Sequence, residues 1–256
     1  MNYHKQHILL YLLPLMAVIV SLGSNANYLV SILLFWGIPA LLLTIWAPQR
    51  SLKVLLISLS ATVFFMALDV IFYATKQWNV LSTVFNNRLL GIVAWEDILY
   101  FFLFAYFPII FWEHFYEKQV HERLWTKRMT RLTYVFVLFL AIVLTAWYWF
   151  PTILQIPYFY LVATVLLMVT PLVMELRSRP HFSLKFVKVG LYFAYSATLY
   201  ELTALYLGLW NYPSIQFLGW IEVRGLRFPI EELFAWILLG AVAVITWYEY
   251  FDDDNR

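Results

Sequence analysis

Six acidic residues lie inside or at the start of long apolar segments. Asp69 and Glu201 lie within two of these segments, and Glu96-Asp97 and Glu231-Glu232 begin two others. Ionisable side chains at such places in membrane helices are rare and usually functional. Where carboxyls cluster with little water, one can stay protonated as a general acid while an ionised neighbour serves as the general base. These six residues are therefore the candidate catalytic groups.

Five further residues lie beside these acids in the sequence and are candidates for contacting a substrate. They are Phe72, Tyr73, Trp95, Trp236 and Arg227. The faces of aromatic rings can stabilise a cation, and an arginine can orient carboxylates. Helix capping and ion pairs with Arg224 and Arg227 would also account for the acid pairs that begin segments. Capping does not account for Asp69 and Glu201, which lie a turn or more inside.

The composition is that of a membrane protein. Of the 256 residues, 63% are hydrophobic and 12% are charged, whereas a typical soluble domain has about 25% charged residues. The apolar residues fall in blocks of roughly 20, the length that crosses a bilayer as a helix. The chain has no cysteine, which excludes disulfides and thiolate metal sites.

The hydropathy pattern predicts an all-α membrane bundle of eight helices. The predicted spans are 8–23, 28–47, 53–74, 92–113, 132–150, 153–174, 184–208 and 229–249, with kinks at Pro14 and Pro39. If the N-terminus is cytoplasmic, 13 of the 17 Lys and Arg lie on the inner side, and Lys76, Arg88, Arg224 and Arg227 lie on the outer side. This bias follows the positive-inside rule and predicts a multi-pass cell-membrane protein with both termini cytoplasmic.

The polar residues also indicate an internal duplication. Asp69 and Trp78-Asn79 match Glu201 and Trp210-Asn211 at a separation of 132 residues. Trp95-Glu96-Asp97 matches Ile230-Glu231-Glu232 at 135, and Trp112-Glu113 matches Tyr248-Glu249 at 136. The predicted organisation is a first four-span repeat over 1–118, a basic linker over 119–131 and a second repeat over 132–256. Parallel repeats of this kind place a shared site between the halves.

Other kinds of site are poorly represented in the sequence. There is no Gly-rich phosphate loop or dinucleotide fingerprint, so no motif calls for a cofactor; whether a reduced cofactor is needed indirectly stays open. No metal site is expected, because the five histidines fall on the inner side, away from the acids. No paired Asp-rich motif for magnesium diphosphate lies inside a span, which argues against a membrane prenyltransferase. No nucleic-acid partner is expected, and the partners would be the bilayer and an apolar substrate.

The doubled motif resembles the membrane-embedded lycopene cyclase family. Each half has an acid in a helix, a Trp nine residues later and an acid pair that opens the next helix. In the second half this pair stands in Pro229-Ile230-Glu231-Glu232, whereas no proline precedes Glu96-Asp97. The resemblance is to the tandem-fused form of a cyclase domain that also occurs as two polypeptides, and it covers nearly the whole chain.

The resemblance implies a lycopene cyclase, an isomerase of carotenoid biosynthesis that closes linear end groups into rings without net redox change. Its carotenoid substrate would be protonated at a terminal double bond, close through a carbocation and lose a proton. Glu231 and Glu232 would form the central acid/base pair, and Asp69, Glu96, Asp97 and Glu201 would tune or share that role.

Three other functions fit parts of the same pattern. A hydratase or another isoprenoid cyclase could use the same acids. A proton-coupled transporter is also compatible with repeats and intramembrane carboxylates. A purely structural membrane subunit would tolerate neutralisation of all six acids.

Overall fold

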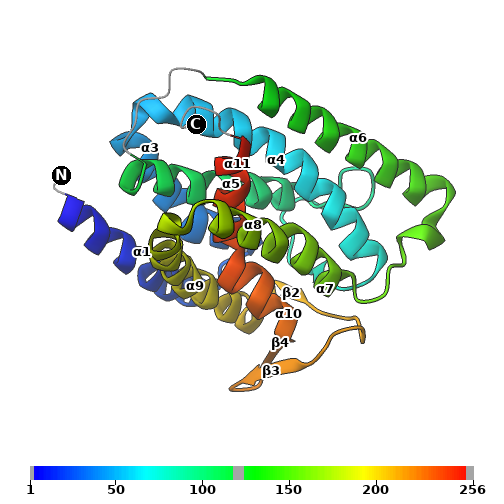
Figure 1. The fold of residues 1–256 in the computed structure, drawn as a ribbon. Helices are drawn as coiled ribbons and strands as arrows, with labels where there is room; N and C mark the ends of the chain where they lie inside the picture. The colour runs from blue at the N-terminus through cyan, green and yellow to red at the C-terminus, as the bar shows by residue number, and fades with distance from the viewer. Residues whose placement is uncertain (1–2, 118–123, 252–256) are drawn as a thin grey trace.

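The computed structural model describes residues 3–117 and 124–251, which are mainly helical (Figure 1). Residues 119–123 of the predicted linker lie outside the described residues. The first half contains α1 (Tyr3–Ser24), α2 (Tyr28–Ile32), η1 (Leu33–Gly37), α3 (Ile38–Trp46), α4 (Pro48–Ala74), β1 (Asn79–Val80) and α5 (Trp95–Phe115). Next come α6 (Lys127–Trp149), η2 (Pro151–Leu154), α7 (Phe159–Thr164), η3 (Val165–Val169), α8 (Thr170–Ser178), η4 (Pro180–Phe182) and α9 (Ser183–Tyr206). The chain ends with β2 (Trp210–Asn211), β3 (Trp220–Val223), β4 (Leu226–Pro229), α10 (Ile230–Glu232), η5 (Leu233–Leu239) and α11 (Gly240–Phe251).

The predicted all-α membrane bundle is confirmed at the level of its helices. Consecutive helical elements join into eight rods, and seven of these are long and apolar enough to cross a membrane within the described residues. The remaining rod, α9, has 24 residues and contains Lys185, Lys188 and Glu201. At 1.5 Å per residue it is about 36 Å long, which is enough to cross the hydrocarbon core.

Two local features differ from the expected spans. The sixth rod begins at Phe159 and not at 153, because the short 3₁₀ turn η2 and Pro157 occupy the start of that segment. The residues before Pro229 form an antiparallel hairpin of β3 and β4. Its turn places Arg224 and Gly225 at positive φ, the geometry of a tight hairpin turn with a right-handed twist. The hairpin leads directly into α10.

Two of the helix irregularities precede prolines at matching places. The π-helical turn η1 ends just before Pro39, and η3 ends just before Pro171. Proline has no N–H for the usual helical bond, so the preceding turn widens to place its carbonyls elsewhere. The expected kink at Pro39 is thus realised as a π-helical turn, whereas Pro14 lies inside the continuous helix α1.

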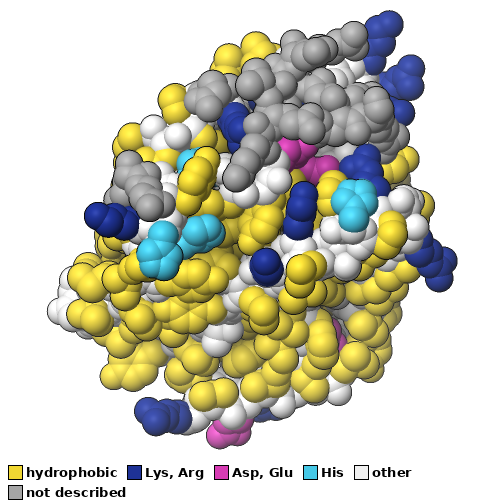
Figure 2. Space-filling view, turned by 60° about the vertical axis from the view of Figure 1, so that its left-hand side comes forward, with side chains coloured by type: hydrophobic (Ala, Val, Ile, Leu, Met, Phe, Trp, Pro, Cys, Tyr) yellow, Lys and Arg dark blue, Asp and Glu magenta, His cyan; other side chains and the backbone are white. Residues whose placement is uncertain are grey.

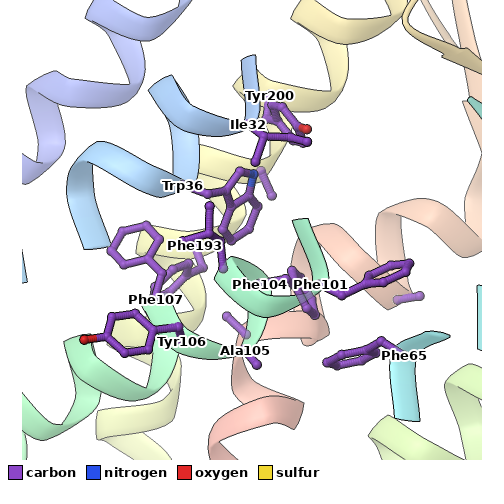
Figure 3. Close-up of a cluster of buried hydrophobic side chains, with 14 of the residues drawn as sticks. Ile32, Trp36, Phe65, Phe101, Phe104, Ala105, Tyr106, Phe107, Phe193 and Tyr200 are labelled. Atoms are coloured by element: carbon purple, nitrogen blue, oxygen red, sulfur yellow. The ribbon is translucent and has the colours of Figure 1, made fainter. Parts of the chain in front are cut away.

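The centre of the bundle is packed with aromatic rings. Helix α4 packs mainly against α5 and α6, whereas α1 packs against α9, and α6 runs along one margin of the molecule (Figure 1). Figure 3 shows Trp36, Phe104, Phe107 and Phe193 gathered between the helices. The Phe107 and Phe193 ring centroids are 4.8 Å apart. Ring packing at such distances stabilises a core beyond simple burial.

Apolar side chains cover the middle of the outer surface, and basic side chains gather at one end (Figure 2). Ile19, Leu138 and Leu191 are each at least 60% exposed. A contiguous apolar surface of this size is unfavourable in water and favourable in hydrocarbon. The molecule is therefore a multi-pass membrane protein.

Gly240 allows the two halves of the core to meet closely. A Cβ atom at this position would lie 2.7 Å from Cζ of Phe104 and 3.2 Å from the Ala235 carbonyl oxygen. Such overpacking costs about 1–3 kcal/mol, more than the roughly 1 kcal/mol that alanine gains over glycine in a helix. We predict that Gly240→Ala lowers the thermal unfolding temperature in detergent. Gly23→Ala is the matched control, because a Cβ at that helical position meets nothing within 4 Å.

Candidate functional site

A closed-in chamber at one end of the bundle brings together three of the predicted acids. Asp69 of α4, Glu201 of α9 and Glu232 of α10 line it, and all three side chains are buried. The other walls are mainly aromatic and include Trp36, shown with Tyr200 in Figure 3. The empty space, counted to its opening, is about 630 Å³. The enclosed part of this space is about 40 Å³, which is room for only a few water molecules.

Tyrosine and tryptophan side chains hold two of these acids. Tyr160 donates a short hydrogen bond to Oε2 of Glu232. Tyr212 donates to Oε1 of Glu201 at 2.8 Å, and Nε1 of Trp210 donates to the same oxygen at 3.3 Å. Burial, together with the nearby Glu201, raises the pKa of Tyr212 well above its usual value of 10.0. Tyr212 therefore keeps its proton and donates.

Asp97 lies behind the chamber wall and is held by Tyr28. The Tyr28 hydroxyl donates to Oδ1 of Asp97 at 2.9 Å, and the Ala94 backbone N–H donates to Oδ2 at 3.3 Å. Tyr28 itself lines the chamber. Asp97 can therefore influence the chamber through the tyrosine hydroxyl, while it also caps α5.

The other member of each acid pair faces a loop. Glu96 accepts hydrogen bonds from the backbone N–H groups of Val84 and Phe85, and Glu231 accepts one from Leu218 at 2.6 Å. Neighbouring residues on a helix point about 100° apart. Only one carboxyl of each pair can therefore face the bundle interior while the other holds the loop that precedes its helix.

Only two of the five predicted substrate contacts line the chamber. Phe72 and Trp236 line the chamber. Trp95 is 46% exposed and Tyr73 is 38% exposed, and neither is among the chamber walls. Arg227 is exposed on β4, where its guanidinium lies 4.1 Å from the Trp220 ring centroid. Arg227 thus braces the hairpin outside the chamber.

Several residues of the site went unnoticed in the sequence. Tyr28 and Tyr160 hold Asp97 and Glu232 in corresponding ways, and they are 132 residues apart. This separation equals that of Asp69 and Glu201, so a search at the same interval for tyrosines would have found them. The hydroxyl of Tyr200 is buried in the chamber wall without a hydrogen-bond partner among the described residues. It is available to a ligand.

A wide apolar groove lies directly beside the chamber. Its empty space, including its open mouth, is about 1580 Å³, and its walls come from α4, α5, α6, α7, η3, η5 and α11. Five residues line both the groove and the chamber: Phe65, Leu68, Phe72, Tyr160 and Trp236. The groove extends as far as Arg131 and Phe251. These shared side chains lie between the groove and the chamber, so the acids are separated from the groove by a single layer of mainly apolar side chains.

A second buried polar cluster lies at the other end of α5. Nε1 of Trp112 donates to Glu249 at 2.6 Å, and Tyr248 donates to Glu113. The Arg179 guanidinium lies 3.2 Å from Glu249 and forms an ion pair with it. The cluster ties α5 and α11 together.

Glu231 provides a direct test of the loop-holding geometry. We predict that Glu231→Gln speeds hydrogen exchange at the Leu218 amide, because a neutral amide oxygen accepts a weaker hydrogen bond than a carboxylate. If exchange at Leu218 is about tenfold slower with the native carboxylate than with the amide, the carboxylate hydrogen bond is stronger by roughly 1.4 kcal/mol. Exchange measured by mass spectrometry would show the change, with Glu232→Gln as the matched control. Equal protection of Leu218 in Glu231→Gln and the native chain would contradict the assignment.

The groups that face the chamber are carboxyls, phenol hydroxyls and indole N–H groups among aromatic rings. Within residues 3–117 and 124–251, no three His, Asp or Glu side chains are grouped so that they could hold a metal ion. The chemistry visible in the chamber is proton donation and acceptance. No protein-family model, curated protein or solved structure matches the chain.

Proposed function

We propose that the protein is an isomerase of the lycopene cyclase type, which closes the linear end group of a carotenoid into a ring. One observation carries the proposal: buried carboxyls share an aromatic chamber that lies directly beside an apolar groove. A long polyene fits such a groove, and its end group meets an acid and a base. Tyr160 and Tyr212 hold two of the carboxyls in place.

In the proposed reaction, a protonated carboxyl in the chamber donates its proton to the terminal double bond. The O–H bond breaks as a C–H bond forms, and the adjacent carbon becomes a cation. A second double bond attacks this cation and closes the ring. An ionised carboxylate then removes a proton from the ring, and the electrons of that C–H bond form the final double bond. The substrate gains and loses one proton, so no redox partner enters the balance.

The chamber geometry favours Glu232 over Glu231 as the residue that meets the substrate. Glu232 lines the chamber, whereas Glu231 holds the Leu218 backbone. Asp69 and Glu201 are the other carboxyls on the chamber wall. The faces of Phe72 and Trp236 lie on the same wall and would stabilise the cation.

We further propose that the chain is a tandem duplication with pseudo-twofold symmetry. Three structural relations support this. Asn79 pairs with Asn211, which is 132 residues later, in the β1–β2 ladder. Trp112 bonds to Glu249 while Tyr248 bonds to Glu113, so the matched pairs exchange partners. The π-helical turns η1 and η3 also begin and end 132 residues apart.

The π-helical turn η5 accounts for a change in the separation between the halves. The separation is 135 residues at the acid pairs and 136 at Trp112-Glu113. η5 lies between these two places in the second half, and the corresponding part of α5 is α-helical. A π-helical turn accommodates one extra residue in an α-helix. A single inserted residue in η5 thus explains the change.

Glu232→Gln tests the proposed chemistry. We predict that it abolishes ring formation in cells that produce lycopene, since the amide cannot exchange a proton at the end group. Pigment extracts separated by chromatography give the readout, and protein level in the membrane is measured alongside. Glu231→Gln is the matched control and should retain ring formation unless loss of the loop contact lowers protein level. Cyclic product in undiminished yield from Glu232→Gln would overturn the assignment.

Expression in the same lycopene-producing cells also distinguishes the proposed cyclase from the alternative functions. A hydratase would yield a hydroxylated end group, and a transporter or structural subunit would leave the pigment unchanged. The native chain is therefore expressed first, beside an empty vector. A new cyclic pigment is the expected result.

We also propose eight membrane spans with both termini cytoplasmic. The chain has no cysteine, so single cysteines can report sidedness. We predict that a membrane-impermeant maleimide labels Asn87→Cys and Ile215→Cys in intact cells and labels Ser178→Cys only after lysis. All three side chains are exposed. Labelling of Ser178→Cys and Ile215→Cys from one side would mean that α9 does not cross.

A further inference from the structure

The two halves of the proposed duplication have corresponding interiors, and these interiors are filled differently. Under the proposed duplication, positions on α4 correspond to positions on α9, and positions on α5 correspond to positions on α11. Three aromatic residues of one interior have small residues at the corresponding positions of the other. The pairs are Phe193 with Ala61 at a separation of 132, and Phe104 with Gly240 and Phe107 with Ala243 at a separation of 136.

The interior between α5, α9 and η1 is filled by these rings. Phe193 lies 4.8 Å from Phe107 and 5.4 Å from Phe111 between ring centroids. The Trp36 ring lies above them, with centroids 6.5 Å from Phe193 and 6.1 Å from Phe107 (Figure 3). All four side chains are at most 3% exposed. These rings occupy the space between the helices at the positions that correspond to Ala61 and Ala243.

The corresponding interior between α4, α11 and η3 is the open groove. Ala61, Gly240 and Ala243 line it, and Met168 occupies the place that corresponds to Trp36. At Ala61 and Ala243 the groove takes up space that rings fill in the other half, whereas the Phe104 ring itself lies against Gly240 and lines the groove. Space of this kind inside a packed protein is unfavourable unless something occupies it.

We infer that this groove is the single binding site for the substrate's chain, so that a symmetric polyene enters with one end at a time. This inference rests on the proposed function. The occupant is a long, unbranched or lightly branched apolar chain. Residues of α6 form part of its wall, and Phe65, Phe72 and Trp236 line both the groove and the chamber.

A consequence concerns the order of the two reactions on a symmetric substrate. Because the matched interior is closed by Phe107 and Phe193, the second end of the chain has no equivalent route to the acids. After one ring forms, the product must leave the groove and return in the opposite direction. The product with one ring is therefore a free intermediate.

Groove binding is tested in a chain that cannot turn over. Glu232→Gln is purified from cells that produce a linear polyene, and the pigment per protein is measured by absorbance after extraction. We expect pigment to be retained. Adding Ala61→Trp should reduce the retained pigment at least tenfold, because the indole fills the groove. Leu59→Trp is the matched control, since Leu59 lies on the same helix and is 50% exposed.

The order of reaction is tested with the native protein and a molar excess of lycopene in liposomes. We expect the one-ring product to rise above the protein concentration before the two-ring product does. Formation of the two-ring product while the one-ring product stays below the protein concentration would overturn the inference. Equal pigment retention by Ala61→Trp and Leu59→Trp, at equal thermal stability, would also overturn it.

The two proposals fail differently. If the native chain forms no ring while Ala61→Trp still removes the bound polyene, the groove assignment holds and the cyclase assignment fails. If rings form at the native rate in Ala61→Trp, the cyclase assignment holds and the groove assignment fails.

Discussion

Carboxyl groups buried in a low-dielectric interior need hydrogen-bond donors, and this need shapes much of the molecule. Tyr28, Tyr160 and Tyr212 donate to the carboxyls in and around the chamber. Backbone N–H groups of two loops donate to Glu96 and Glu231. The acids thus hold the loops, the hairpin and the helix starts in place. In turn, the loops supply the hydrogen-bond donors that make burial of the acids tolerable.

This mutual dependence explains why each acid pair has divided roles. A carboxylate that accepts backbone N–H bonds is fixed and cannot readily turn towards a ligand. Its neighbour, about 100° around the helix, faces the rings. The same arrangement recurs at the start of α5 and of α10, with Glu96 and Glu231 on the loops. A paired motif of this kind combines one carboxyl that accepts from a loop backbone and one that accepts from a buried tyrosine hydroxyl.

The sequence allowed the helices to be predicted well because long apolar blocks have few alternatives in a bilayer. Of the six acids that the repeat spacing placed in one shared site, Asp69, Glu201 and Glu232 line the chamber, and Glu96, Asp97 and Glu231 do not. The orientation of Glu231 was not predicted, although helical geometry shows that adjacent residues cannot face the same side. The hairpin was missed because its strands are only four residues long. The groove was not foreseeable, since it depends on which of many apolar side chains are small where they meet.

The distance between the two polar clusters sets the length of the apolar band between them. Asp97 and Glu113 stand near opposite ends of α5, and the sixteen residues between them correspond to about 24 Å of helix. The apolar band between the clusters must match the hydrocarbon around it, because mismatch is relieved by tilting the helices or thinning the bilayer. The groove spans this band, from the side chains that it shares with the chamber to Arg131 and Phe251 near the second cluster. Bilayer thickness thereby becomes a physical variable that sets how deep an occupant's end group sits relative to the acids.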